Sequence, residues 1–124
     1  MRLRTVIVAL LLAASAAPAG AEDSADRQAL AARLHQAIAR CWAVPADVPD
    51  YVEAVRVKFS LTRAGALDGS PSLEGPVAGD PATKAFAASA VRAVVRCAPF
   101  SGLAQLAPYD AWKTVVVTFR RPDL

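Results

Sequence analysis

Two cysteines, Cys41 and Cys97, are the residues whose type and spacing imply chemistry most directly. Thiols of exported proteins are normally oxidised in pairs, and two cysteines allow only one intramolecular bond. The pair lies too far apart in the sequence for a C-x-x-C redox motif, and no cluster of histidines and cysteines indicates zinc. We therefore predict a structural Cys41–Cys97 disulfide. A redox-active or intermolecular pair is the alternative.

The other reactive side chains are scattered and form no catalytic set. His35 is the only histidine of the chain, and we expect it to be solvated on a helix. Asp47, Asp50 and Glu53 cluster before the first predicted strand, where a solvated loop is favoured over a general acid and base pair. We predict no catalytic residue, no metal site and no cofactor, which makes an enzyme the least favoured functional class.

The N-terminus has the features of a cleavable export signal. A short basic region ends at Arg4, an unbroken apolar run (VIVALLLAA) follows, and small residues lead to an A-x-A sequence that ends at Ala21. The apolar run is shorter than the about 20 residues that a bilayer-spanning helix needs. We predict that residues 1–21 are a signal peptide, that residues 22–124 form one domain, and that this domain works in the periplasm. An uncleaved membrane anchor is the alternative.

The charge balance argues against a nucleic-acid ligand. The chain has 14 lysines and arginines against 11 aspartates and glutamates, and two of the arginines lie in the predicted signal. The mature domain is therefore nearly neutral, whereas nucleic-acid binders use excess positive charge to neutralise phosphates. So small a domain has a core of marginal stability, so a disulfide would contribute much of the total.

Two segments have the periodicity of amphipathic helices. The first covers residues 24–41, and its apolar residues share one face: Leu30, Leu34, Ile38 and Cys41. The second covers residues 81–97 and starts at Asp80-Pro81, an N-cap acceptor followed by proline at the first helical position. Each cysteine falls in the last turn of its helix, so the bridge would clamp the two helix ends together.

Three segments have the features of strands. Residues 54–62 and 114–120 alternate between apolar and polar side chains, as expected of an antiparallel sheet with one buried face. Residues 66–73 form a weaker strand that contains Gly69 and Pro71. We predict an α+β fold in which two main helices pack a three-stranded antiparallel sheet, in the order α-β-β-α-β.

This ordered set of features resembles the C-terminal domain of the cell-envelope protein TolA, which shares its general fold with the TonB C-terminal domain. The resemblance spans residues 25–122. The features that carry it are Cys41-Trp42 and Pro45 after the first helix, the strand Val55 to Leu61 with Gly65 after it, the helix end Ala93 to Phe100, the segment Tyr109 to Lys113, and a strand that ends at Phe119.

The resemblance implies a binding module. Domains of this family bind partners of the Tol–Pal system in the periplasm, and related domains pair an extended peptide from a periplasmic or outer-membrane partner with a sheet edge. Filamentous phage and colicins exploit the same domain of the family. The last strand matches the available edge of the family, so the implied partner-binding residues are Thr114, Val115, Val116, Val117, Thr118 and Phe119.

One departure from the family leaves further functions open. TolA and TonB have a membrane anchor and a long spacer before this domain, whereas this chain is expected to have a cleavable signal and almost no spacer. It would not transmit force from the inner membrane alone. The alternatives are a transport component that works beside a separate anchored partner, and a small structural or inhibitory envelope protein whose last strand is covered.

Overall fold

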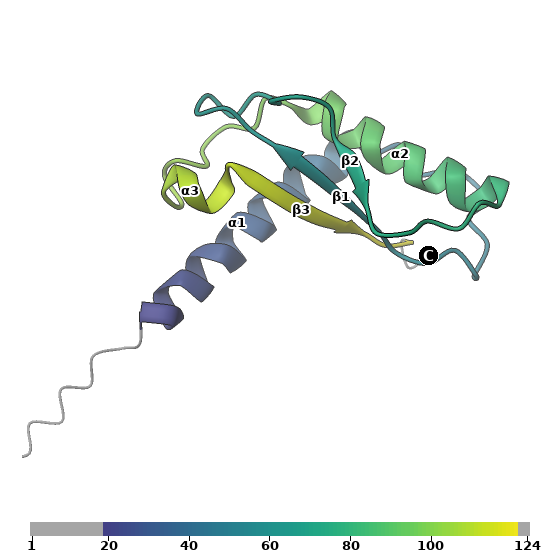
Figure 1. The fold of residues 1–124 in the computed structure, drawn as a ribbon, viewed down its shortest axis with the longest axis horizontal. Helices are drawn as coiled ribbons and strands as arrows, with labels where there is room; N and C mark the ends of the chain where they lie inside the picture. Colours follow the sequence, from purple (N-terminus) through teal and green to yellow (C-terminus); the bar gives the residue numbers. More distant parts are fainter. Residues whose placement is uncertain (1–18, 122–124) are drawn as a thin grey trace, which may run out of the picture.

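The structure, a computed structural model, describes residues 19–121, with side chains from residue 25 onward (Figure 1). Most of the predicted signal peptide lies outside the described residues. The elements are α1 (Ala19–Cys41), β1 (Val55–Ser60), β2 (Ser72–Glu74), α2 (Pro81–Cys97), α3 (Tyr109–Trp112) and β3 (Thr114–Phe119). This order confirms the predicted α+β fold. In the described part of the chain, no helix has the length and apolarity that a membrane span requires.

The three strands form one antiparallel sheet in the order β2-β1-β3. The β1–β3 ladder covers all six residues of each strand, from Val55 opposite Phe119 to Ser60 opposite Thr114. The ladder between β1 and β2 covers only three pairs, with Lys58 opposite Ser72 at one end. Strand β1 is therefore central, and β3 is a long edge strand.

The helices α1 and α2 pack against one face of the sheet and leave the other face open (Figure 1). The alternating pattern of β1 is the reason, because Val57 and Phe59 are buried while Lys58 between them is exposed. Helix α1 contributes residues that the periodicity predicted, including Leu34 and Ile38, and α2 contributes Phe86. One contiguous core fills the space between the two layers.

Two links hold the ends of the helices in place. The predicted disulfide between Cys41 and Cys97 is confirmed, with Cα atoms 5.6 Å apart. Next to it, the indole N–H of Trp42 donates to the Ser89 hydroxyl over 3.0 Å. The Trp42 ring also packs edge-on against Phe86 and Phe119, with ring centroids 5.6 and 5.2 Å apart. The end of α1 is thereby fixed against both α2 and β3.

The bounds of α1 and of the three strands differ from the predicted ones. Helix α1 begins at Ala19, five residues before the expected start at Ser24. The second strand is Ser72–Glu74 instead of residues 66–73, and only Leu67 of the earlier part makes a β-bridge, to Leu61. Pro71 interrupts the segment because it has no N–H for a ladder bond. Strands β1 and β3 are each shorter than predicted.

Candidate functional site

The outer edge of β3 is the main candidate site, and the sheet register shows which backbone groups it offers. The N–H of Leu61 donates to the carbonyl of Lys113 over 2.8 Å. In an antiparallel ladder every second pair is bonded in this way, so the bonded pairs of β3 involve Val115, Val117 and Phe119. The N–H and C=O groups of the alternate residues point away from β1: Thr114, Val116 and Thr118.

No strand of the described part of the chain lies beyond β3, so this edge is unpaired in the sheet. The six predicted site residues thus divide into two sets. The side chains of Val117 and Phe119 are buried in the core and that of Val115 is partly buried. The side chains of Thr114, Val116 and Thr118 face the open side of the sheet, and Val116 is 43% exposed. The resemblance named the strand, but the register was needed to separate these sets.

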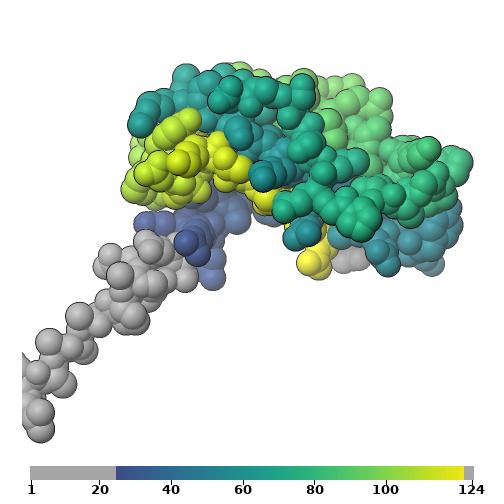
Figure 2. All heavy atoms as spheres, viewed as in Figure 1, coloured from purple at the N-terminus to yellow at the C-terminus, as the bar shows by residue number. Residues whose placement is uncertain are grey.

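Helix α1 passes beneath β3, and two hollows open at this junction. The first has a volume of about 200 Å³, and its walls come from the first half of β3 and from Arg27, Leu30, Ala31, Leu34, His35, Ala111 and Trp112. The second has a volume of about 590 Å³, and its walls come from Val117 to Arg121 and from His35, Ile38, Ala39 and Trp42. The two hollows share His35 and Val117. Figure 2 shows yellow atoms of the C-terminal segment at the surface, with blue-purple atoms of α1 next to them.

Helix α3 positions the first residue of this edge. The Tyr109 hydroxyl donates to the carbonyl of Leu61 over 2.6 Å, and the indole N–H of Trp112 donates to the carbonyl of Ala107 over 3.0 Å. The guanidinium of Arg63 stacks 4.4 Å from the Tyr109 ring centroid. The sequence analysis used this segment as one feature of the family resemblance but predicted no helix there. The two aromatic residues directly before an alternating strand were the signal that could have indicated it.

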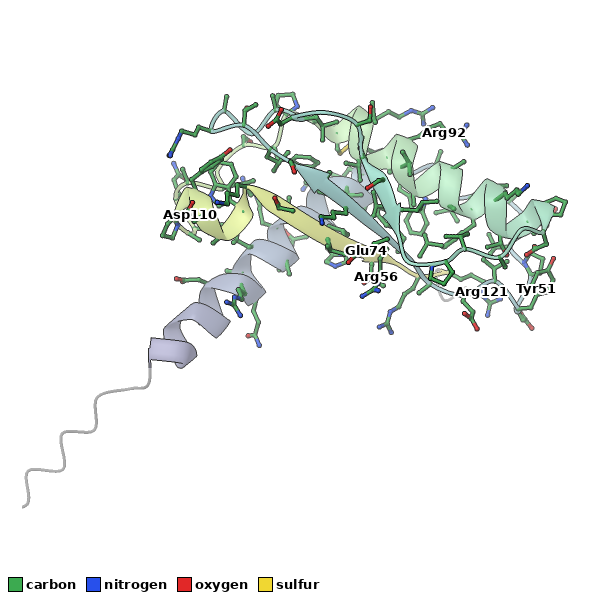
Figure 3. The ribbon with its side chains drawn as sticks, in the orientation of Figure 1. Tyr51, Arg56, Glu74, Arg92, Asp110 and Arg121 are labelled. Atoms are coloured by element: carbon green, nitrogen blue, oxygen red, sulfur yellow. A yellow bond between two sulfur atoms is a disulfide. The ribbon has the colours of Figure 1, made fainter. Side chains whose placement is uncertain are left out.

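Ion pairs mark both ends of β3. Lys113, directly before the strand, pairs with Asp110 over 3.4 Å. Arg121, directly after it, pairs with Asp50 of the loop that follows α1. Figure 3 shows Asp110 and Arg121 at opposite ends of the strand. These pairs are exposed and each contributes at most about 1 kcal/mol to stability, so their main effect is on the local charge.

The remaining candidate residues lie where the sequence analysis expected them, on the surface. His35 is exposed on α1, and Asp47, Asp50 and Glu53 are exposed in the loop before β1. Among the described residues, no three side chains of histidine, cysteine, aspartate or glutamate are grouped as a metal ion would need. The structure brings His35 to the β3 edge, which the sequence analysis did not predict.

The pKa of one carboxyl departs clearly from its ordinary value. Asp80 accepts a hydrogen bond from the backbone N–H of Thr83 over 3.0 Å, as the N-cap of α2 should. The hydrogen bonds from Thr83 lower the pKa of Asp80. The shift therefore reflects the hydrogen bonds that this carboxylate accepts as the cap of α2.

Comparison with known proteins yields one family. Residues 24–123 match the family described as "Uncharacterised conserved protein UCP034077", which covers nearly the whole described part of the chain. No curated protein matches the sequence. No solved structure matches it either.

Proposed function

We propose a function for this chain, which belongs to the family UCP034077, from the free edge of its strand β3. The chain is a periplasmic interaction module that resembles the TolA C-terminal domain and binds an extended segment of an envelope protein or peptide. The segment pairs with β3 as an additional strand, in a role linked to Tol–Pal envelope integrity. The observation that carries this proposal is the outward direction of the backbone groups of Thr114, Val116 and Thr118.

A free edge of this length favours pairing with another chain. Six consecutive residues of β3 are in strand conformation, and their sequence TVVVTF has a high β-propensity. Proteins normally cover or interrupt such edges, because an exposed edge promotes aggregation. Up to about six new backbone hydrogen bonds could form at the three outward residues, each contributing about 0.5–1.5 kcal/mol before the cost of ordering the partner.

Helix α1 supports this mode of binding. A strand added at about 4.8 Å from β3 would extend the sheet over the part of α1 that projects beyond its edge (Figure 1). The two hollows lie at this place and would receive every second side chain of the added strand. Backbone bonds would then supply affinity, and the hollows would supply selectivity.

A proline at position 116 tests the edge. The Val116 N–H points outward, so Val116→Pro removes a donor of the free edge without breaking a bond to β1. Val116→Thr is the matched control, because it keeps the N–H and the β-branched shape. Each folded variant, checked by circular dichroism, is used to capture partners from periplasmic extract, and captured proteins are identified by mass spectrometry. We expect a partner that binds the wild type and Val116→Thr but is lost with Val116→Pro.

A partner that binds all three forms equally would contradict strand addition at β3. If no protein is captured by the wild type either, the chain has a fold like TolA without its binding function. Capture of a membrane-anchored protein through the edge would instead favour the transport role.

A further inference from the structure

Basic side chains outnumber acidic ones around the β3 edge. The residues that line the two hollows include three arginines, Arg27, Arg120 and Arg121, and the single histidine His35. No aspartate or glutamate lines either hollow. On the open face, Lys58 lies directly opposite Val116, the centre of the edge, and adds a further positive charge.

This arrangement is a segregation of charge and not a general excess. The chain as a whole has only three more basic than acidic residues. Three of the acidic residues, Glu53, Glu74 and Asp80, line a separate hollow of about 410 Å³. The Arg56 side chain lies there too, opposite Glu74 across the sheet (Figure 3). The two hollows at the β3 edge are thus basic, although Arg27 also lines a neighbouring hollow with Asp26 and Asp110.

Some of the positive charges near the edge are already neutralised, and others are not. Lys113 and Arg121 have carboxylate partners in Asp110 and Asp50. Among the described side chains, no carboxylate pairs with Arg27, Lys58 or Arg120. Arg27 and Arg120 lie beside the first half and the end of β3. Lys58 lies one strand further in, on β1, opposite the centre of β3 on the open face of the sheet.

We infer that the segment received by β3 is acidic: an extended peptide whose apolar residues pair with the strand and whose carboxylates face Arg27, Lys58 and Arg120. This inference rests on the proposed strand addition and adds the chemistry of the partner. Opposite charges raise the association rate and fix the register of the added strand, and they exclude basic segments. The small side chains of Ala31 and Ala39 on α1 leave room for the added strand beside the basic groups.

The same charges argue against a second copy of this chain as the occupant. Two β3 edges paired antiparallel about Val116 would bring the arginines and lysines of both copies to one seam. Like charges across such a seam repel, and positively charged edge residues are a common protection against edge-to-edge association. The charge pattern therefore favours an acidic partner over self-association.

Peptide selection tests the inference directly. A random library of peptides about 10 residues long, enough to cover a typical strand with its flanks, is selected by mRNA display against the disulfide-bonded domain. We expect enriched peptides to combine an alternating apolar core with aspartate or glutamate and to lack lysine and arginine. Their affinity, measured by fluorescence anisotropy, should fall as salt rises from about 0.1 to about 0.5 M, because the charges at the edge are exposed.

Carboxylates introduced on α1 give the matched variants. His35→Glu places a carboxylate in both hollows, whereas Gln36→Glu places it one residue further on the helix, outside them. Arg27→Glu is compared in the same way with Arg92→Glu on the outer face of α2 (Figure 3). We expect His35→Glu and Arg27→Glu each to weaken binding of the selected peptides about three- to tenfold, and both controls to leave it unchanged.

The outcomes separate this inference from the proposed function. Two results would overturn the acidic partner and leave strand addition intact, provided that Val116→Pro abolishes peptide binding. In the first, the selected peptides are not enriched in acidic residues. In the second, their affinity is unchanged by His35→Glu and Arg27→Glu. Peptides that ignore Val116→Pro, or the absence of any enriched peptide, would overturn both. A domain that sediments as a dimer through the β3 edge would show that the occupant is a second copy.

Discussion

At the scale of single residues, Gly65 connects two segments that lie far apart in the sequence. Gly65 has a positive φ of 80°, and a Cβ there would overlap the backbone carbonyl of Phe100. Its own carbonyl accepts a hydrogen bond from the Phe100 N–H over 2.8 Å. Only glycine fits both the left-handed backbone and this close contact. The sequence analysis noted Gly65 after the first predicted strand but did not show what it touches.

The Asp80 cap provides a prediction about pH. Because hydrogen bonds to Thr83 lower its pKa, the contribution of the Asp80 carboxylate to stability is complete above its ordinary pKa and is lost as pH falls through the lowered value. Asp80→Asn keeps an acceptor at the cap but does not titrate there. We expect thermal unfolding of the wild type to lose more stability between neutral pH and about pH 2 than the variant loses.

Asp80→Ala is the control for the Asp80 cap, because it removes the acceptor at every pH. It should lower the unfolding temperature already at neutral pH, whereas Asp80→Asn should change it little. Equal acid sensitivity in the wild type and Asp80→Asn would mean that this carboxylate does not contribute to acid unfolding.

At the scale of elements, the local pattern explains what each segment becomes, and neighbouring elements explain where it lies. Helix α2 has the predicted bounds because its start is encoded by Asp80-Pro81 and its end by the proline at position 99. Strand β3 has the predicted alternation, but its position depends on the short helix α3. Tyr109 fixes α3 to Leu61, so β3 begins in register with β1.

Hydrogen exchange tests the register of β3. The amides of Val115 and Val117 bond to β1, whereas those of Val116 and Thr118 point to the free edge. We expect the first pair to exchange slowly and the second pair rapidly, as followed by NMR of the folded domain without a partner. Equal protection of all four amides would show that the edge is covered. Protection in the opposite order would show that the register is shifted by one residue.

At the scale of the whole molecule, a two-layer fold of this size depends on few long-range contacts. The core has one contiguous cluster, and the helices α1 and α2 pack on each other as well as on the sheet. The disulfide joins residues 56 apart in sequence at the ends of these helices. Its effect should be large because it limits the freedom of the unfolded chain over a long loop.

Removal of the disulfide tests how much it contributes to the stability of the fold. On the chain-entropy account, the variant with Cys41→Ser and Cys97→Ser should lose about 4 kcal/mol of unfolding free energy. Urea denaturation of the oxidised wild type and of the double variant measures the difference. Far-UV circular dichroism serves as a control for folding, since the helix and strand content should be the same in both native states. A loss below about 1 kcal/mol would mean that packing alone holds the helix ends.

The sequence by itself determined much of the secondary structure and its order. Periodicities of about 3.6 and 2 residues reveal which side chains share a face, and two cysteines leave one intramolecular pairing. The second strand was placed only roughly, because its Gly69 and Pro71 suppress the alternating pattern. The short helix α3 was missed, because four residues are too few to display a helical period.

Only the tertiary structure decided that β3 is an edge strand beside β1 and what surrounds its free edge. Strand order depends on contacts between residues far apart in the sequence, so an alternating pattern cannot distinguish an edge strand from a central one. The passage of α1 beneath β3 brings His35 and Arg27 beside the edge, and no local pattern encodes that meeting. The candidate site is therefore a property of the packing, built from residues whose own sequence neighbourhoods indicate only a helix and a strand.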